Sequence, residues 1–261
     1  MGQIVLQLIL AGLAMGFIYA LVSIEYTIIW NASGLLNFSH ERFILLGAYI
    51  FGAQLIVNMN FNSAAAVIAA LIIAFLIGMA VSYILVRPLQ YLPLVFSVTG
   101  TIMLGRIITE SVRIIWGNNP IPLANWLQGV FHVGNLVISR TYVAIILTAI
   151  CLVIALQLFL NKTKLGTAMR CLSQNRNAAR LMGIDVDFLA AVTMGVSTLV
   201  CAVIGILIIP LFQIRGDMTG MIGLKGFASG VFGGFGYLPG GILGGVLIGV
   251  LESLSTLVIP G

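Results

Sequence analysis

Charged residues are scarce in this sequence: Asp, Glu, Lys and Arg make up only 7% of its 261 residues. A typical soluble domain carries about 25% charged residues, so a soluble fold of this length has too few charges to cover its surface. Because 61% of the residues are hydrophobic, we expect a lipid bilayer to be the solvent. The net charge of +5 does not indicate nucleic-acid binding, since no basic run is interleaved with aromatic residues.

Residues that bind metals or carry out catalysis are also scarce. The three cysteines, Cys151, Cys171 and Cys201, show no CxxC or other metal-ligand spacing, and a cysteine in an apolar run is usually a small buried hydrophobe. Of the two histidines, only His40 stands beside an acid, Glu41, which is too sparse for a metal site. We therefore expect no catalytic residue, no metal and no cofactor.

A nucleotide-binding loop is missing as well. The sole Lys-Thr pair is Lys162-Thr163, and Asn161 stands where a phosphate-binding loop requires glycine. The chain is therefore not expected to hydrolyse ATP itself.

Long apolar runs dominate what is present. A helix needs about 20 apolar residues to span a bilayer, and seven runs approach that length: Ile4–Ile29, Leu35–Val57, Ala64–Val86, Leu94–Trp116, Tyr142–Leu160, Phe188–Phe212 and Ile242–Val258. An eighth run, Met221–Phe232, is short and glycine-rich, which favours a broken or re-entrant helix. The runs do not alternate as membrane strands do. They predict one domain over residues 1–261, an all-α polytopic transmembrane bundle with about seven spans.

The basic residues predict an orientation for these spans. If residues 162–186 are cytoplasmic, alternation of the spans places Arg87 on the same side, and Arg140 and Arg215 on the other. Five Lys and Arg residues in 162–186 then join Arg87, giving six against two. Positive charge concentrates in cytoplasmic loops, so we expect the N-terminus outside, residues 162–186 inside and the loop 117–139 as an external cap.

The polar segment Lys162–Val186, called the basic segment below, is the one long interruption between apolar runs. Ser173 is a plausible start and Gly183 a plausible stop for a short helix within it. One face of that helix would carry residues spaced i, i+3, i+7 and i+10, namely Leu172, Asn175, Ala179 and Met182. Composition alone leaves two readings open, a positive loop that orients the protein or a helix that docks a partner.

The order of residues in three segments favours docking. The basic segment contains a Leu-Gly pair, an Arg, an Asn, an Ala-rich stretch and a closing Leu-x-Gly-Ile, formed here by Leu165, Gly166, Arg170, Asn175, Ala178, Ala179, Leu181, Gly183 and Ile184. "GLLNFSH" at 34–40 and the glycine-rich stretch 223–253 are the other two. Together they resemble the ABC-importer permeases of the branched-chain amino acid (LivH/LivM) type, in the right order over nearly the whole chain.

The resemblance implies a function and a set of partners. Such a permease moves branched-chain or other small amino acids across the bacterial cytoplasmic (inner) membrane. It does so with a second permease subunit, usually as a heterodimer, two ATP-binding subunits and an extracytoplasmic solute-binding protein. The basic segment is then the helix that fits the ATP-binding subunit, and its expected coupling residues are Gly166, Arg170, Leu172, Asn175, Ala179, Met182 and Gly183.

A rival reading is an ion-coupled secondary transporter or channel for small polar solutes such as urea or amides. Proteins of that class couple through acids inside the membrane, a role that Glu25 and Glu110 are placed to serve. The basic segment, and the lack of a detectable repeat of halves, favour the importer instead.

The chain departs from the family pattern at three places. Members usually have His-Gly-acid where this chain reads His40-Glu41-Arg42, and they usually have glycine near Glu25. Members also usually continue beyond the position of Gly261 with a further span and a basic tail.

Charges inside the predicted spans are costly, about 2.5–3.5 kcal/mol each on insertion scales, so we expect them to avoid lipid. Glu25 is expected beside a basic partner such as Arg42 or Arg106. The series Arg106, Glu110 and Arg113 lies on one helix face and is either a self-neutralised cluster or a polar stripe along a solute path. The expected path residues are Asn37, His40, Glu25, Arg106 and Glu110.

The glycines near the C-terminus predict close helix contacts. Overlapping GxxxG pairs are formed by Gly240, Gly241, Gly244, Gly245 and Gly249, and small residues at this spacing let helices approach. Packing within the subunit is favoured over a dimer seam. The stretch Val231–Gly241 has too many glycines, with Pro239, to continue as one smooth helix.

Overall fold

The computed structural model describes residues 2–34, 36–89, 92–123, 126–127, 129–133 and 136–257. Its elements, in chain order, are α1 (Gly2–Ser33), α2 (His40–Ala48), the π-helical η1 (Tyr49–Asn58), α3 (Ser63–Val81), η2 (Ser82–Val86), α4 (Arg87–Leu89), α5 (Leu94–Trp116), β1 (Val130–Val133), β2 (Leu136–Ser139), α6 (Arg140–Lys162), α7 (Lys164–Gln174), α8 (Arg176–Leu181), α9 (Val186–Phe212), α10 (Gly220–Phe232) and α11 (Leu238–Ser255). The predicted helical membrane bundle is confirmed.

Six helical segments among the described residues are long and apolar enough to cross a membrane: Val5–Asn31, Ser63–Leu89, Leu94–Trp116, Arg140–Lys162, Val186–Phe212 and Leu238–Ser255. The other predicted span, Leu35–Val57, becomes the continuous pair α2 and η1, which begins only at His40. The prediction that this span starts at Leu35 was wrong, because residues 36–39 are not helical.

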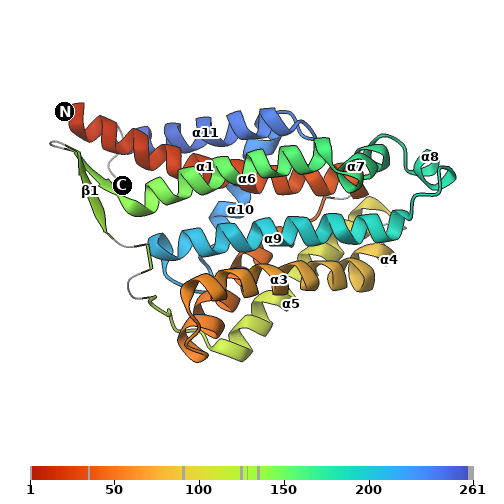
Figure 1. The fold of residues 1–261 in the computed structure, drawn as a ribbon, viewed down its shortest axis with the longest axis horizontal. Helices are drawn as coiled ribbons and strands as arrows, with labels where there is room; N and C mark the ends of the chain where they lie inside the picture. The colour runs from red at the N-terminus through yellow and green to blue at the C-terminus, as the bar shows by residue number, and fades with distance from the viewer. Residues whose placement is uncertain are drawn as a thin grey trace.

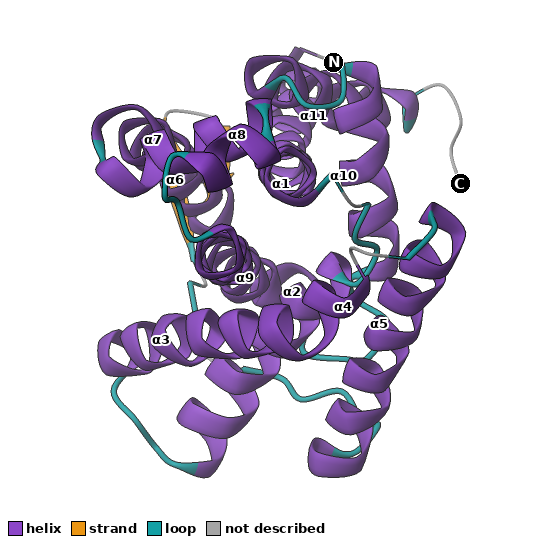
Figure 2. Cartoon of the chain, turned by 90° about the vertical axis from the view of Figure 1, so that its right-hand side faces the viewer, coloured by secondary structure: helices purple, strands orange, loops and turns teal. Residues whose placement is uncertain are grey.

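Helix α9 forms the centre of the bundle and is buried along most of its length. Seen from the end that carries α7 and α8 (Figure 2), α1 and α9 lie side by side, with α11 beyond α1 and α3 beyond α9. The contact of α9 with its neighbours is close: a Cβ on Gly47 of α2 would overlap the backbone of Ala202, and the Thr198 hydroxyl donates to the Ala74 carbonyl of α3 at 3.0 Å.

Helices α1 and α11 pack backbone to backbone. A Cβ on Gly249 would overlap Gly16, and a Cβ on Gly245 would overlap the backbone of Ala20. Gly240 and Gly244 face the end of α10 in the same way. The predicted glycine set therefore lies in contacts inside this subunit.

The short helix α10 lies against the middle of α1. A Cβ on Gly226 would overlap Val22, and the Ser229 hydroxyl donates to the Tyr19 carbonyl at 3.2 Å. Residues 233–237 then turn the chain into α11, which confirms the predicted break. Helix α10 is thus a short helix at the depth of a span, as the glycine-rich run predicted.

The two ends of the bundle differ in character. In Figure 1, α7, α8 and α4 gather at one end, and the N-terminus and the β-hairpin lie at the other. An ion pair of 2.7 Å joins Arg87 of α4 to Asp187 at the start of α9, so the basic segment and Arg87 share one end, as the charge pattern predicted.

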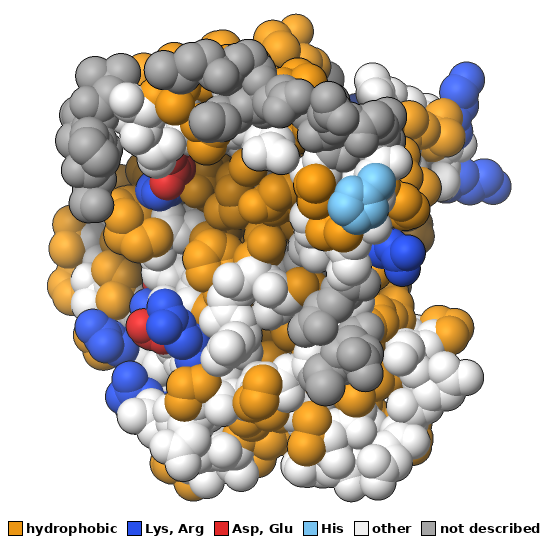
Figure 3. Space-filling view, turned by 90° about the vertical axis from the view of Figure 1, so that its left-hand side faces the viewer, with side chains coloured by type: hydrophobic (Ala, Val, Ile, Leu, Met, Phe, Trp, Pro, Cys, Tyr) orange, Lys and Arg blue, Asp and Glu red, His pale blue; other side chains and the backbone are white. Residues whose placement is uncertain are grey.

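The opposite end is capped by loop 117–139, which contains an antiparallel hairpin in which Val130 pairs with Ser139. The Trp126 indole donates to the Ile206 carbonyl at 3.2 Å and fixes the cap to α9. The space-filling view of this end (Figure 3) shows a mostly hydrophobic and uncharged face with a hollow near its centre. Charged side chains lie on it in small groups. Among the described residues, β-type pairing is limited to this hairpin and an isolated bridge between Ile121 and Ile214.

Candidate functional site

The basic segment folds as two helices rather than one. Helix α7 starts after Thr163, whose hydroxyl accepts from the Gly166 N–H at 2.9 Å, and it ends at Gln174. Asn175 then caps α8, because its side-chain oxygen accepts from the Asn177 and Ala178 N–H groups at 3.0 Å. Ser173 is therefore inside α7 and is not the cap that we predicted. Gly183, with φ of 78°, ends α8 as predicted.

The predicted docking face of the basic segment is not one surface. The break at Asn175 turns the chain, so the four residues do not lie along a single helix face. Leu172 and Ala179 are 3% and 2% exposed and pack with Met169 against Leu189 of α9. The expectation that they form an outward face was wrong, because they close a small apolar core that fixes the segment to α9.

The most exposed apolar residues of the basic segment are Met182, which belongs to the predicted face, and its neighbour Leu181, which does not. Leu181 is 89% exposed and Met182 is 82% exposed at the end of α8. The basic residue Arg180 precedes them and is also exposed. Exposed apolar side chains in a polar extramembrane segment indicate a contact surface. Spacing alone misses Leu181, because it lies outside the predicted stripe.

Enlarging Ala179 is expected to loosen the basic segment. A tryptophan there overfills the core shared with Leu172 and Leu189, which typically costs about 1–3 kcal/mol. The detergent-purified Ala179→Trp variant should be cut faster by trypsin within residues 162–180. Asn177→Trp, at an exposed position of the same helix, is the matched control and should be cut at the native rate. Equal rates for all three proteins would contradict the buried core.

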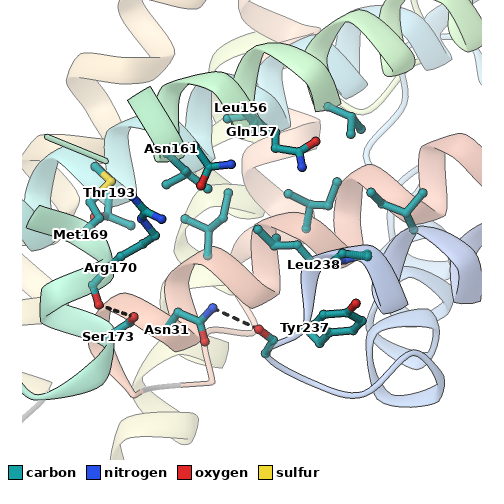
Figure 4. Close-up of a pocket in the computed structure, with 17 residues that line it drawn as sticks. Asn31, Leu156, Gln157, Asn161, Met169, Arg170, Ser173, Thr193, Tyr237 and Leu238 are labelled. Atoms are coloured by element: carbon teal, nitrogen blue, oxygen red, sulfur yellow. Dashed lines mark hydrogen bonds between the residues drawn. The ribbon is translucent and has the colours of Figure 1, made fainter. Parts of the chain in front are cut away.

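A cavity of about 470 Å³ lies where the basic segment meets the bundle. Figure 4 shows it between α1, α6, α7 and the start of α11, with Arg170 on one side and Tyr237 and Leu238 on the other. Its walls are mainly apolar, and its polar side chains are Asn31, Gln157, Asn161, Arg170, Ser173, Thr193 and Tyr237. The predicted coupling residue Arg170 lines it, whereas none of the five predicted path residues does.

Residues 36–39 run through the protein interior without helical structure. Asn37 is 1% exposed, and its amide oxygen accepts from the Ser39 N–H at 2.9 Å. The Phe38 N–H donates to the Thr101 hydroxyl of α5 at 3.2 Å. The Asn37 amide donates weakly to Met194 Sδ of α9 at 3.8 Å. The Thr101 hydroxyl of α5 and the Asn37 amide oxygen thus accept from backbone N–H groups that a helix would otherwise satisfy, while Met194 of α9 accepts from the Asn37 side chain.

His40 follows this stretch and meets two groups from other helices. Glu25 of α1, His40 of α2 and Cys201 of α9 are all 0% exposed. The Cys201 thiol donates to Glu25 Oε2 at 3.0 Å, and Cys201 Sγ lies 3.7 Å from His40 Nδ1. Among the described residues, Glu25 Oε1 and His40 Nε2 have no hydrogen-bond partner.

The prediction that Glu25 lies beside an arginine partner is therefore wrong. Arg42 pairs instead with its neighbour Glu41 at 2.8 Å, and Glu25 meets the thiol of Cys201 and the imidazole of His40. No local pattern indicates Cys201 as a partner, because 176 residues separate it from Glu25. Sequence spacing predicts no group of metal ligands, because it cannot show that Glu25, His40 and Cys201 meet in the fold.

The remaining two predicted path residues lie elsewhere. Arg106 and Glu110 are exposed on α5, and Glu110 pairs with Arg113 at 3.1 Å. Arg106 is close enough to interact electrostatically with half-buried Glu41. The five residues thus form two groups, a buried one with Asn37, His40 and Glu25, and an exposed one on α5.

Comparison with known proteins gives consistent matches over nearly the whole chain. Residues 8–260 match the model of the family described as "Branched-chain amino acid transport system / permease component". The high-affinity branched-chain amino acid transport system permease protein LivH of Salmonella typhimurium is 28% identical, covering 96% of this chain and 86% of the relative. LivH of Escherichia coli K12 is 27% identical, and BraD of Pseudomonas aeruginosa is 28% identical, with the same coverage. No solved structure matches significantly.

Proposed function

This chain belongs to the family of permease components of branched-chain amino acid transport systems, and on that premise we propose that it is the membrane subunit of an ABC importer for small amino acids, branched-chain ones foremost. The relatives are named for branched-chain amino acid transport. The chain is a transport component and part of an ABC transporter complex, and the driving energy in this proposal comes from ATP hydrolysis in partner subunits.

The observation that carries the proposal is the basic segment. It stands outside the bundle at one end (Figure 1) and presents Leu181 and Met182 outward. In the proposal this apolar pair sits in a groove of an ATP-binding subunit, with the predicted coupling residues Gly166, Asn175 and Gly183 shaping the two helices behind it. A Cβ on Gly166 would overlap the backbone of Leu160, so this glycine allows α7 to fold back on α6.

The packing of the segment supplies a route for coupling. Leu172 and Ala179 pack against α9, and α9 contacts α1, α2 and α3. A displacement of the segment by the ATP-binding subunit would therefore move α9, rather than a loose loop. We infer that this displacement switches the solute path between the two sides of the membrane.

The orientation and partners follow the same proposal. The basic segment faces the cytoplasm, because six of the predicted loop cations lie at its end of the bundle. The hairpin end then faces outward in the bacterial inner membrane and receives solute from an extracytoplasmic binding protein. A second permease subunit, as a heterodimer partner, completes the path together with two ATP-binding subunits.

The solute itself meets two candidate regions in this proposal. The cavity beside Arg170 has apolar walls for an aliphatic side chain and a guanidinium for a carboxylate. The second region contains three of the five predicted path residues, Asn37, His40 and Glu25, which are buried in this structure and stay predictions. An ion-coupled transporter for urea or amides is not favoured, since the matching family and relatives are named as permease components of branched-chain amino acid transport systems.

Transport by the complex, and not by the chain alone, is the expected outcome in liposomes. The chain has no nucleotide-binding loop, so vesicles that contain only this polypeptide should show no ATP-dependent leucine uptake. Adding the partner permease, the ATP-binding subunits and the binding protein should produce uptake. Uptake by the chain alone that follows a proton or sodium gradient would instead support the ion-coupled alternative.

A further inference from the structure

The buried cluster of Glu25, His40 and Cys201 has the composition of a metal site. One ligand atom from each residue lies within 4.8 Å of the other two. The three side chains come from α1, α2 and α9, which are different helices. A thiolate, an imidazole and a carboxylate are the three ligand types that zinc takes in proteins.

The distances suit one ion held by all three groups. With bond lengths of about 2.3 Å to sulfur and about 2.0–2.2 Å to nitrogen and oxygen, tetrahedral zinc places sulfur about 3.5 Å from each of the other ligands. Cys201 Sγ lies 3.0 Å from Glu25 Oε2 and 3.7 Å from His40 Nδ1. Both separations are within about half an ångström of that geometry.

The electrostatics also favour an ion. A carboxylate enclosed in an apolar interior is costly unless it is paired, and among the described residues no arginine or lysine forms an ion pair with Glu25. A divalent cation bound by one carboxylate, one thiolate and one neutral imidazole gives a site with no net charge. Within the described part of the chain, Glu25 Oε1 is buried without a hydrogen-bond partner. A cation bound to the Glu25 carboxylate compensates the charge on this oxygen as well.

We propose that Glu25, His40 and Cys201 bind a divalent zinc-class cation that ties α1, α2 and α9 together. The ion fixes the start of α2 directly after the non-helical residues 36–39. The Ser197 hydroxyl, 3.4 Å from His40 Nδ1, lies next to the three proposed ligands. The site rests on geometry, and it shares Glu25 and His40 with the predicted solute path, so that a bound ion makes these two residues structural rather than solute-binding.

Metal content of the full chain tests the site. The chain carries an affinity tag free of histidine and cysteine, is expressed in zinc-supplemented medium, and is purified in detergent without chelator. Plasma mass spectrometry should find about one zinc per chain, the stoichiometry of a single site. Cys201→Ser and Glu25→Gln should each lower the content several-fold.

The other two cysteines supply matched controls. Cys151 and Cys171 are exposed, so Cys151→Ser and Cys171→Ser should keep the full zinc content. Wild-type chain from cobalt-supplemented cells should show a thiolate-to-cobalt charge-transfer band that both serine controls retain and that Glu25→Gln loses. This spectrum reports on the site even if Cys201→Ser fails to fold. Wild-type protein without zinc or the cobalt band, or zinc that Glu25→Gln leaves unchanged, would overturn the proposal.

Discussion

Placing aspartate at both Leu181 and Met182 is expected to abolish ATP-driven uptake while the membrane part stays folded. Both side chains are more than 80% exposed, so their replacement leaves the apolar core of the basic segment intact. Buried apolar anchors of an interface typically contribute about 2 kcal/mol or more, and a charge in their place adds a desolvation cost. Since 1.4 kcal/mol is a factor of ten, the ATP-binding subunit should bind at least about 30-fold more weakly.

Pull-down of the ATP-binding subunit and leucine uptake by the reconstituted complex measure the effect. Asn177→Asp is the matched control, because it adds the same charge to an exposed position of α8 without removing an apolar side chain. The control should bind and transport normally. If the double variant also binds and transports normally, the pair is not the docking surface, and the basic segment serves only to orient the protein.

Replacing Gly249 by leucine is expected to prevent the chain from folding into a stable bundle. A Cβ at this position already overlaps the backbone of Gly16, and a larger side chain has to push α11 away from α1. The loss extends along the whole contact, since Gly245 meets Ala20 one turn earlier. Close contacts of this kind provide most of the attraction between helices in lipid.

Size-exclusion chromatography and the yield of monodisperse protein in mild detergent report the result. We expect the Gly249→Leu variant to be lost largely to aggregates. Leu247→Trp adds comparable bulk to the exposed side of the same helix and should give a native yield. A native elution profile for Gly249→Leu would show that α11 packs against α1 less closely than the structure indicates.

Sequence patterns predicted the spans because each is a long, continuous apolar run. The break before Leu238 was equally readable, since glycines and Pro239 cluster there. The four-residue spacing of Gly245, Gly249 and the other glycines of this helix predicted a close helix contact. The spacing does not indicate which helix they contact. Only the fold identifies α1 and α10 as the partners.

The candidate site was harder to predict from the sequence than the spans were. Asn175 fits a helix interior by spacing, yet its short side chain caps a new helix, and this break hides Ala179 and exposes Leu181. The grouping of Glu25, His40 and Cys201 depends on three helices meeting at one depth, which no local pattern encodes. Helix α2 begins late because the Phe38 N–H bonds to Thr101 of α5 and the Ser39 N–H bonds to the Asn37 side chain, so these groups have partners outside a helix.

That late start of α2 constrains how the protein is made. The Phe38 N–H depends on Thr101, which is synthesised 63 residues later, and Asn37 depends on Met194, which follows 157 residues later. Until α5 has entered the membrane, the Phe38 N–H lacks the partner that it has in the folded protein, and lipid supplies none. We therefore expect Phe38 to stay beside water or the insertion machinery until α5 has been translated, so that the start of α2 reaches its final position only after α5 is in place.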